Sequence, residues 1–202
     1  MKKLDGKNKN LQTQMKILTN ILEQSPKINI ILNRMQELDL KNYYIVSGCV
    51  FQTVWNYILD LPSDYGIDDI DIIYYDDDIS IEKENEISHK INNIFEDMDL
   101  KFGIINEARA HLWLKRRFNI EIKQYISLEN AIDTFGTTVQ TLGIRKENGN
   151  LKVYAPNGLN DVFCLTLNPN NYGIFNQDMY NKKVSKYLSK WPQLNVMPWN
   201  EE

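Results

Sequence analysis

The stretch that decides the fold runs from Tyr43 to Asp78 and reads YYIVSGCVFQTVWNYILDLPSDYGIDDIDIIYYDDD. The apolar segment Tyr43–Val46 predicts a short strand that turns at Ser47-Gly48, and apolar residues at helical spacing predict a helix over Cys49–Leu59. A loop of Asp, Ser and Gly then leads to a second predicted strand, Asp69–Tyr75. The order strand, turn, helix, strand is the frame from which the rest of the chain is interpreted.

The second strand begins with two acids separated by one residue, Asp69 and Asp71. Alternate side chains of a strand point to the same face, so both carboxylates project together, roughly 6–7 Å apart along the strand. Carboxylates placed in this way bind hard divalent cations such as Mg²⁺ or Mn²⁺, with substrate phosphates completing the coordination shell. We therefore predict that Asp69 and Asp71 are metal ligands and catalytic residues.

The Ser47-Gly48 turn is expected to lie where the first helix of this unit begins. Backbone N–H groups and the helix dipole at such a position attract anions. We expect Ser47 and Gly48 to bind nucleotide phosphates, and the Ser47 hydroxyl also fits a helix N-cap, so both roles stay open. A predicted cation site beside a predicted anion site indicates nucleotide chemistry.

Further motifs accompany this stretch. They are Gly48, Val54-Trp55-Asn56, Asp69-Ile70-Asp71, Tyr75, Asp76, Asn106 to Trp113, Ala131 to Thr134, Tyr154 to Phe163 and Trp191-Pro192. In these residues the chain resembles the polymerase-β-type nucleotidyltransferase superfamily, whose signature is a Gly-Ser or Gly-Gly turn, a helix and Asp-x-Asp on the next strand. The nearer resemblance is to a bacterial group of small nucleotidyltransferase-family proteins, and it covers most of the chain from about Tyr43 onward.

The resemblance implies an α+β (α/β-like) fold, in which a polymerase-β-type core has a mixed sheet flanked by helices, with an N-terminal helical pair and a C-terminal helix. We expect one domain over 1–202, with N-terminal helices over 1–40, a catalytic-type core over 43–125, and a hairpin and helices over 126–202. The resemblance also implies metal-dependent transfer of a nucleoside monophosphate from an NTP to an acceptor hydroxyl. The acceptor stays open between a protein, an RNA end and a small molecule.

The superfamily places a third carboxylate on a later strand, as metal ligand or as base for the attacking hydroxyl. The matching predicted strand, Leu100–Asn106, reads LKFGIIN, with Gly103 and Ile105 where an acid is expected. Glu107 is the nearest acid and alternates in phase with both, so we predict a catalytic role for it, with an exposed strand-end Glu as the alternative. The departure favours a second hypothesis, a nucleotide-binding or partner-binding module on the same fold.

Arg109 and His111 are the remaining candidate catalytic residues. Arg109 can hold a triphosphate bidentately, and His111 can donate to phosphate or act as a base. If the chain is still extended there, both side chains share a face, whereas in a helix they diverge by about 200°. A packing role is the alternative for His111, which is followed by Leu112 and Trp113.

The remaining elements follow from periodicity and turn residues. We predict helices over Leu11–Leu22, after Ser25-Pro26, over Ser80–Met98, over Ala108–Arg117, over Ser127–Thr134, over Leu159–Leu165 and over Gln177–Ser189, and a hairpin of Val139–Lys146 with Leu151–Tyr154 around Asn148-Gly149. The lysines of the last helix are most simply a solvated face.

Composition limits the partners. The chain has 202 residues, 43% hydrophobic content and a net charge of −4, so no overall basic field predicts strong non-specific binding of long nucleic acid. Cys49 and Cys164 form neither a disulfide framework nor a metal-ligand spacing. No apolar targeting segment or run of about 18 apolar residues is present, so we expect a cytoplasmic protein with no membrane partner.

Overall fold

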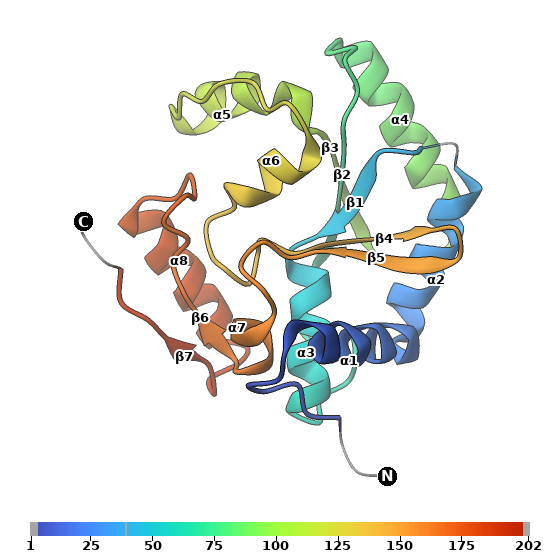
Figure 1. Cartoon of the computed structure of the whole chain (residues 1–202). Helices are drawn as coiled ribbons and strands as arrows, with labels where there is room; N and C mark the ends of the chain where they lie inside the picture. The colour runs from blue at the N-terminus through green and yellow to red at the C-terminus, as the bar shows by residue number, and fades with distance from the viewer. Residues whose placement is uncertain (1–3, 39, 200–202) are drawn as a thin grey trace.

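The computed structural model describes residues 4–38 and 40–199. A five-stranded sheet in the order β3-β2-β1-β4-β5 forms the centre, and a separate pair of short strands, β6-β7, lies near the C-terminus (Figure 1). The strands are β1 (Tyr43–Val46), β2 (Asp69–Tyr74), β3 (Lys101–Asn106), β4 (Gly143–Glu147), β5 (Asn150–Tyr154), β6 (Thr166–Leu167) and β7 (Asn195–Val196). Since β2 and β3 run parallel while the other neighbours in the large sheet are antiparallel, the predicted mixed sheet is confirmed.

Helices flank this sheet, as the sequence predicts. They are α1 (Leu11–Gln24), α2 (Pro26–Arg34), α3 (Gly48–Ile58), α4 (Ile81–Ile94), α5 (Ala110–Phe118), α6 (Leu128–Asp133), α7 (Asn160–Phe163) and α8 (Gln177–Leu188), with 3₁₀ turns η1 (Met35–Glu37) and η2 (Glu107–Arg109). The N-terminal pair begins where expected, because Asn10 caps α1 and Pro26 opens α2. Among the described residues, no helix combines the length and apolarity needed to cross a bilayer.

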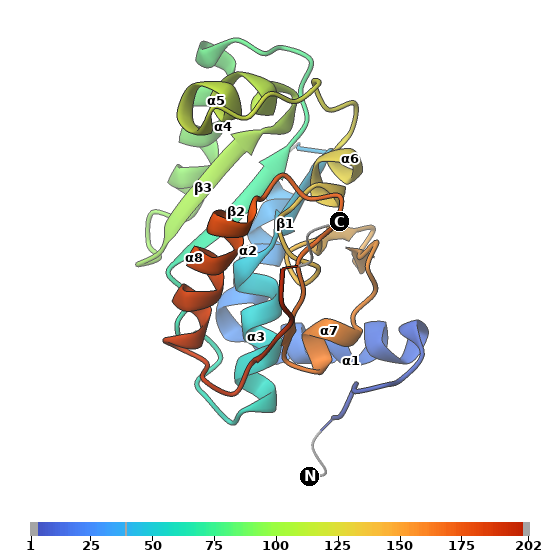
Figure 2. The same ribbon diagram turned by 90° about the vertical axis from the view of Figure 1, so that its left-hand side faces the viewer.

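The unit β1-α3-β2 occupies the middle of the molecule. All four residues of β1 are buried, and every residue of α3 from Cys49 to Asn56 is buried. A helix that is buried all round must be covered on several faces, and in Figure 2 α3 lies between α8 and the N-terminal helices. The rigid packing of this unit fixes the turn between β1 and α3.

The register of the sheet brings the predicted site residues together. Val46 is opposite Asp71 in the antiparallel pair of β1 and β2, so the Ser47-Gly48 turn directly follows the residue that faces this acid. Asp71 is in turn opposite Gly103 in the parallel pair of β2 and β3. The acid therefore lies between the turn and the third strand.

Several predicted boundaries are corrected. The helix predicted to reach Met98 ends at Ile94, with Phe95 at its C-cap, although Ser80 caps its start as expected. The turn at Asn148-Gly149 is confirmed, since both residues have positive φ (51° and 77°). The first strand of that hairpin begins at Gly143, so the preceding segment from Val139 is not a strand because its backbone bonds locally within a turn.

The lysine face of α8 is also corrected. Lys190 and Lys186 both pair with Asp68, at 2.7 Å and 3.3 Å, just before β2 begins. Lys183 is half-buried, and only Lys182 among the four lysines is simply exposed without such a contact. These ion pairs dock α8 beside β2, which the helix's own sequence does not reveal (Figure 2).

Candidate functional site

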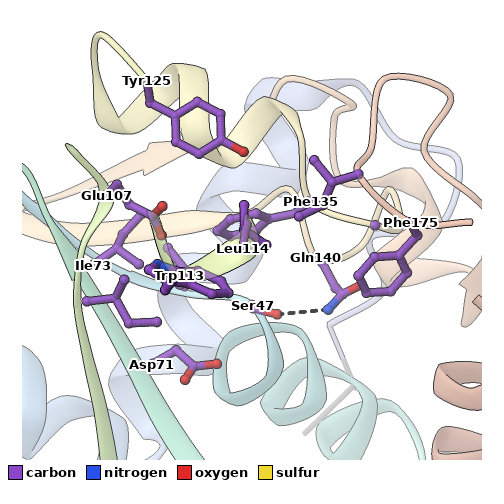
Figure 3. Close-up of a pocket in the computed structure, with 14 residues that line it drawn as sticks. Ser47, Asp71, Ile73, Glu107, Trp113, Leu114, Tyr125, Phe135, Gln140 and Phe175 are labelled. Atoms are coloured by element: carbon purple, nitrogen blue, oxygen red, sulfur yellow. Dashed lines mark hydrogen bonds between the residues drawn. The ribbon is translucent and has the colours of Figure 1, made fainter. Parts of the chain in front are cut away.

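A cavity of about 190 Å³ opens beside Asp71. It is lined by Val46, Ser47, Asp71, Ile73, Ile105, Glu107, Trp113, Leu114, Tyr125, Phe135, Gly136, Gln140, Ile174 and Phe175. Figure 3 shows these side chains around a common space, with Asp71 and Ser47 on the side of α3 and Tyr125 on the opposite side. The cavity therefore joins the Asp-x-Asp strand, the serine turn and segments from the second half of the chain.

The two predicted metal ligands differ in environment. Asp71 is half-buried and lines the cavity, whereas Asp69, two residues earlier, is exposed at the start of β2. Burial, together with the charge of Asp69, raises the pKa of Asp71 to about 6 against the opposing effect of Lys183 and Lys186. Within the described chain, neither carboxylate has a hydrogen bond or ion pair.

Gly103 provides the room that Asp71 needs. A Cβ added at Gly103 would lie 2.6 Å from Oδ1 of Asp71, which is closer than carbon and oxygen atoms can approach without displacement. The glycine that replaces the expected third acid thus leaves space for the second. This contact depends on the strand register and is invisible in the sequence.

The Ser47-Gly48 turn has an unusual backbone. Ser47 adopts φ 59° and ψ −127°, a conformation that favours glycine, and its side chain makes no capping hydrogen bond to α3. Instead its Oγ accepts a hydrogen bond of 3.4 Å from Nε2 of Gln140. The side chain of Ser47 therefore does not cap the 11-residue helix α3, although its carbonyl accepts from the N–H groups of Val50 and Phe51.

Glu107 is buried, so the alternative of an exposed strand-end residue is wrong. Its side chain is 4% exposed, lines the cavity and has no hydrogen-bond partner among the described residues. Burial raises the pKa of Glu107 to about 8, and the charges of Asp71 and Glu84 contribute to the shift. A second acid thus shares the cavity with Asp71.

Arg109 and His111 are not in the lining of the cavity. The chain is already helical at both positions, so the diverging arrangement applies. Arg109 pairs with Glu84 at 2.9 Å and donates to the Ser80 carbonyl at 3.0 Å, while Nδ1 of His111 is buried without a partner among the described residues. In this conformation Arg109 holds the start of α4 in place through these two contacts.

Lys183 is a cation that the sequence analysis did not place near the site. Burial lowers the pKa of Lys183, and Lys186 lowers it further, whereas Asp71 and Asp69 oppose both effects. Its Nζ lies 5.6 Å from the centroid of the Tyr187 ring. The sequence feature that could have predicted this placement is the spacing of Lys183, Lys186 and Lys190, because residues three, four and seven apart share a helix face.

The two aspartates fit a divalent cation only as part of a larger coordination shell. Among the described residues there is no group of three or more His, Cys, Asp or Glu side chains arranged to hold a metal. Asp69 and Asp71 nevertheless form a pair of carboxylates without a direct ion pair in the described chain, and Mg²⁺ is commonly held by one or two carboxylates together with substrate phosphates. The site therefore fits a cation that arrives with, or is completed by, a nucleotide.

Comparison with known proteins decides the family. A family model described as "Nucleotidyltransferase" matches residues 33–196, which include the β1-α3-β2 unit, Glu107 and α8. The chain belongs to this nucleotidyltransferase family. Membership implies transfer of a nucleoside monophosphate from an NTP substrate.

A solved structure has the same fold as this nucleotidyltransferase. It is described by the words "The NMR structure of the protein reveals a CCA-adding enzyme head domain". The two chains are 22% identical, with a TM-score of 0.76, and the match covers 91% of this chain and 96% of the other. No protein of curated function matches the chain.

Proposed function

We propose that the protein transfers a nucleoside monophosphate from an NTP to a hydroxyl group, with a divalent cation bound at Asp69 and Asp71. One observation carries the proposal. Asp71 lies beside the uncapped start of α3 and opens into a cavity that also contains the buried acid Glu107. This arrangement supports the proposal, because phosphoryl transfer needs an anion site, a cation site and a proton acceptor close to one another.

The triphosphate is proposed to bind at the Ser47-Gly48 turn. The free N–H groups and the dipole of α3 attract its oxygens, and the Ser47 hydroxyl can add one donor. Lys183 and Lys186 carry positive charge beside the two aspartates and would offset the remaining charge of the phosphates. Positioning by fixed donors and charges is the main catalytic means available in such a reaction.

Asp69 and Asp71 would hold Mg²⁺ or Mn²⁺. When bound, the cation supplies positive charge to the reacting phosphate and the leaving pyrophosphate. The protein's contribution is to hold Asp71 in place, because β1 and β3 flank it and Gly103 leaves space for its carboxylate. Glu107 is proposed to accept the proton of the attacking hydroxyl, from the same cavity.

Roles for Arg109 and His111 in catalysis stay predictions. A direct phosphate contact would require Arg109 to leave Glu84 and the Ser80 carbonyl. Arg109 instead holds α4 against the end of β3, because its partner Glu84 in α4 also accepts a hydrogen bond from the N–H of Asn106 in β3. Arg109 therefore supports the chain that leads into Glu107.

A nucleotide-binding module without turnover is the second candidate. It is favoured by Gly103 and Ile105, which occupy the strand positions of the expected third acid. The two candidates share nucleotide binding and differ in whether Glu107 replaces the missing acid.

The test uses the full chain with NTPs labelled at the α-phosphate, with and without MgCl₂. Asp69→Asn with Asp71→Asn should abolish Mg²⁺-dependent NTP binding while thermal stability stays similar or improves, because repulsion between the carboxylates falls. Asp77→Asn, an exposed acid of the following loop, is the matched control and should bind normally.

Intact Mg²⁺-dependent binding without any label transfer or NTP consumption would favour the binding module. If the double variant unfolds and the wild-type chain binds no Mg²⁺, the aspartates are structural and the proposal fails.

A further inference from the structure

The cavity continues beyond Asp71 into an aromatic chamber. Its walls away from Asp71 include the rings of Trp113, Tyr125, Phe135 and Phe175, with Ile73 and Ile105 forming the strand side. Flat aromatic walls with few polar groups are typical of sites for small apolar ligands. Part of the site is thus built for something other than a polyphosphate.

The polar groups of the chamber are unevenly satisfied. The side-chain amide of Gln140 has hydrogen-bond partners, because its Oε1 accepts from Thr137 and its Nε2 donates to Ser47. Glu107 has no partner among the described residues although only 4% of it is exposed, and Figure 3 shows its carboxyl group turned toward the other lining side chains. A buried carboxyl without a partner is costly, so a ligand that supplies a donor there is favoured.

Charge and size narrow the ligand further. No lysine, arginine or histidine is among the described residues that line the chamber, so no side chain there would neutralise a phosphate or carboxylate group. The whole cavity, including its Asp71 side, has a volume of about 190 Å³, below the roughly 300–1,000 Å³ of pockets for drug-sized ligands. One ring system fits, whereas a whole nucleotide does not.

We infer that this chamber receives the acceptor, and that the acceptor is an uncharged compound bearing a ring and a hydroxyl group. The inference rests on the proposed function. The hydroxyl oxygen forms a bond to the α-phosphorus, the bond from that phosphorus to the pyrophosphate oxygen breaks, and the hydroxyl proton passes to the Glu107 carboxylate. The products are a nucleoside monophosphate ester of the acceptor and pyrophosphate.

The base of the NTP is the rival occupant of the chamber. Since Glu107 lines this small cavity, a base placed there would fill the space that a hydroxyl needs beside the acid that takes its proton. The reacting group must instead reach both the nucleophile's base and the phosphate. The acceptor carries that reacting group, its hydroxyl, so the chamber suits the acceptor better than the base of the NTP.

The experiment combines a panel of possible acceptors with a variant in which a larger side chain fills the chamber. The wild-type chain is incubated with α-labelled ATP, GTP, CTP or UTP, MgCl₂, and either benzyl alcohol, N-acetyl-tyrosinamide, N-acetyl-serinamide or a short RNA with a free 3′ hydroxyl. Label should pass to at least one of the two ring compounds at ten times or more the rate of the serine compound or the RNA. Benzyl alcohol separates a free small molecule from the tyrosine side chain of a peptide.

The filled chamber is made by Ile174→Phe, and Ile120→Phe, at a half-buried position outside the lining, is its control. Ile174→Phe should lower label transfer and ring-compound binding at least tenfold, while Mg²⁺-dependent NTP affinity changes less than twofold. Binding of the ring compound is measured by saturation-transfer NMR without nucleotide or metal, so this readout does not depend on turnover.

Three results would overturn the inference. They are equal labelling of the serine compound or the RNA, loss of NTP affinity in Ile174→Phe in parallel with transfer, and ring-compound binding that the filled chamber leaves unchanged. Failure of the proposed function is distinguishable, because it would abolish Mg²⁺-dependent NTP binding in the wild-type chain itself.

Discussion

At the scale of single residues, the site depends on side chains and backbone held in costly states. Ser47 keeps a backbone conformation that favours glycine, and the carboxyl groups of half-buried Asp71 and buried Glu107 have no hydrogen-bond partners in the described chain. Strained or desolvated groups persist where the surrounding structure fixes them, and they gather at functional sites. The fully buried strand β1 and helix α3 supply that fixation here.

Ser47→Gly should stabilise the protein by about 1 kcal/mol, because glycine adopts this φ without steric cost. Ser47→Ala keeps the strain and should not stabilise. Both variants lose the hydroxyl, so a fall in NTP affinity shared by both would assign a phosphate contact to Oγ. Denaturant unfolding and nucleotide titration provide the measurements, and equal stabilities for the two variants would contradict the strain argument.

The pH dependence of stability should carry the signature of the two acids that line the cavity, Asp71 and Glu107. The pKa of Asp71 is raised from 3.8 to about 6 and that of Glu107 from 4.5 to about 8, so the folded state binds more protons than the unfolded state between these values. The free energy of unfolding should therefore fall as pH rises from about 4 to about 8 and then level off. In metal-free buffer, Glu107→Gln should flatten the upper part of this profile.

A denaturation series from pH 4 to about pH 9 measures the slope. The exposed acid variant Asp77→Asn, which removes no buried carboxyl, should keep the wild-type profile. A profile of Glu107→Gln that follows the wild type would show that Glu107 ionises normally.

At the scale of elements, α8 closes one side of the site with a row of lysines. Lys190 and Lys186 hold Asp68, and Lys183 continues the same helix face toward Asp71 and Asp69. Exposed ion pairs contribute little stability individually, so the row is better explained by the positive charge that it brings to the start of β2. The helix thus brings positive charge to the start of β2 from about 110 residues away in the chain.

Lys183→Ala should raise the KM for NTP by roughly tenfold, consistent with the loss of about 1.4 kcal/mol of charge-assisted binding. Lys182→Ala is the matched control, because Lys182 is exposed on the same helix and makes no ion pair with Asp68 in the described chain. Steady-state kinetics at low and moderate ionic strength provide the test. Equal effects of the two substitutions would remove Lys183 from the proposed site.

At the scale of the whole molecule, the C-terminal segment completes the core that the middle of the chain begins. The ring of Trp191 is fully buried and lies 5.6 Å from that of Trp55 in α3, and its Nε1 donates to Oδ1 of Asn56 at 2.8 Å. The same region includes the ion pairs from α8 to Asp68. One domain over 1–202 stays a prediction, and these contacts connect its proposed core with its C-terminal helices.

Trp191→Ala should destabilise the protein by about 3–5 kcal/mol, because it empties a large buried site and leaves Asn56 without its donor. Trp199→Ala removes the same side chain from a half-buried position against Tyr180 and should cost clearly less. Thermal and denaturant unfolding measure both. Similar losses would show that the C-terminal segment adds no special support to α3.

The sequence by itself determined the elements whose signals are local. The strand Tyr43–Val46, the turn at Ser47, the helix of α3 and the Asp-x-Asp strand are predicted from adjacent residues, because periodicity and turn chemistry act over a few positions. For the same reason, the sequence predicts that Asp69 and Asp71 project from the same face of their strand. The predicted fold class follows from the order of these elements and is confirmed by the mixed sheet.

Tertiary structure alone decided which groups meet. Segments far apart in the sequence meet in four places. They bury Glu107, pair Arg109 with Glu84, leave space at Gly103 for Asp71, and bring Lys183 close to the aspartates. Burial and pKa depend on every neighbouring element, so no local pattern encodes them. The aromatic chamber has the same origin, because its walls come from strands, helices and loops that only packing brings together.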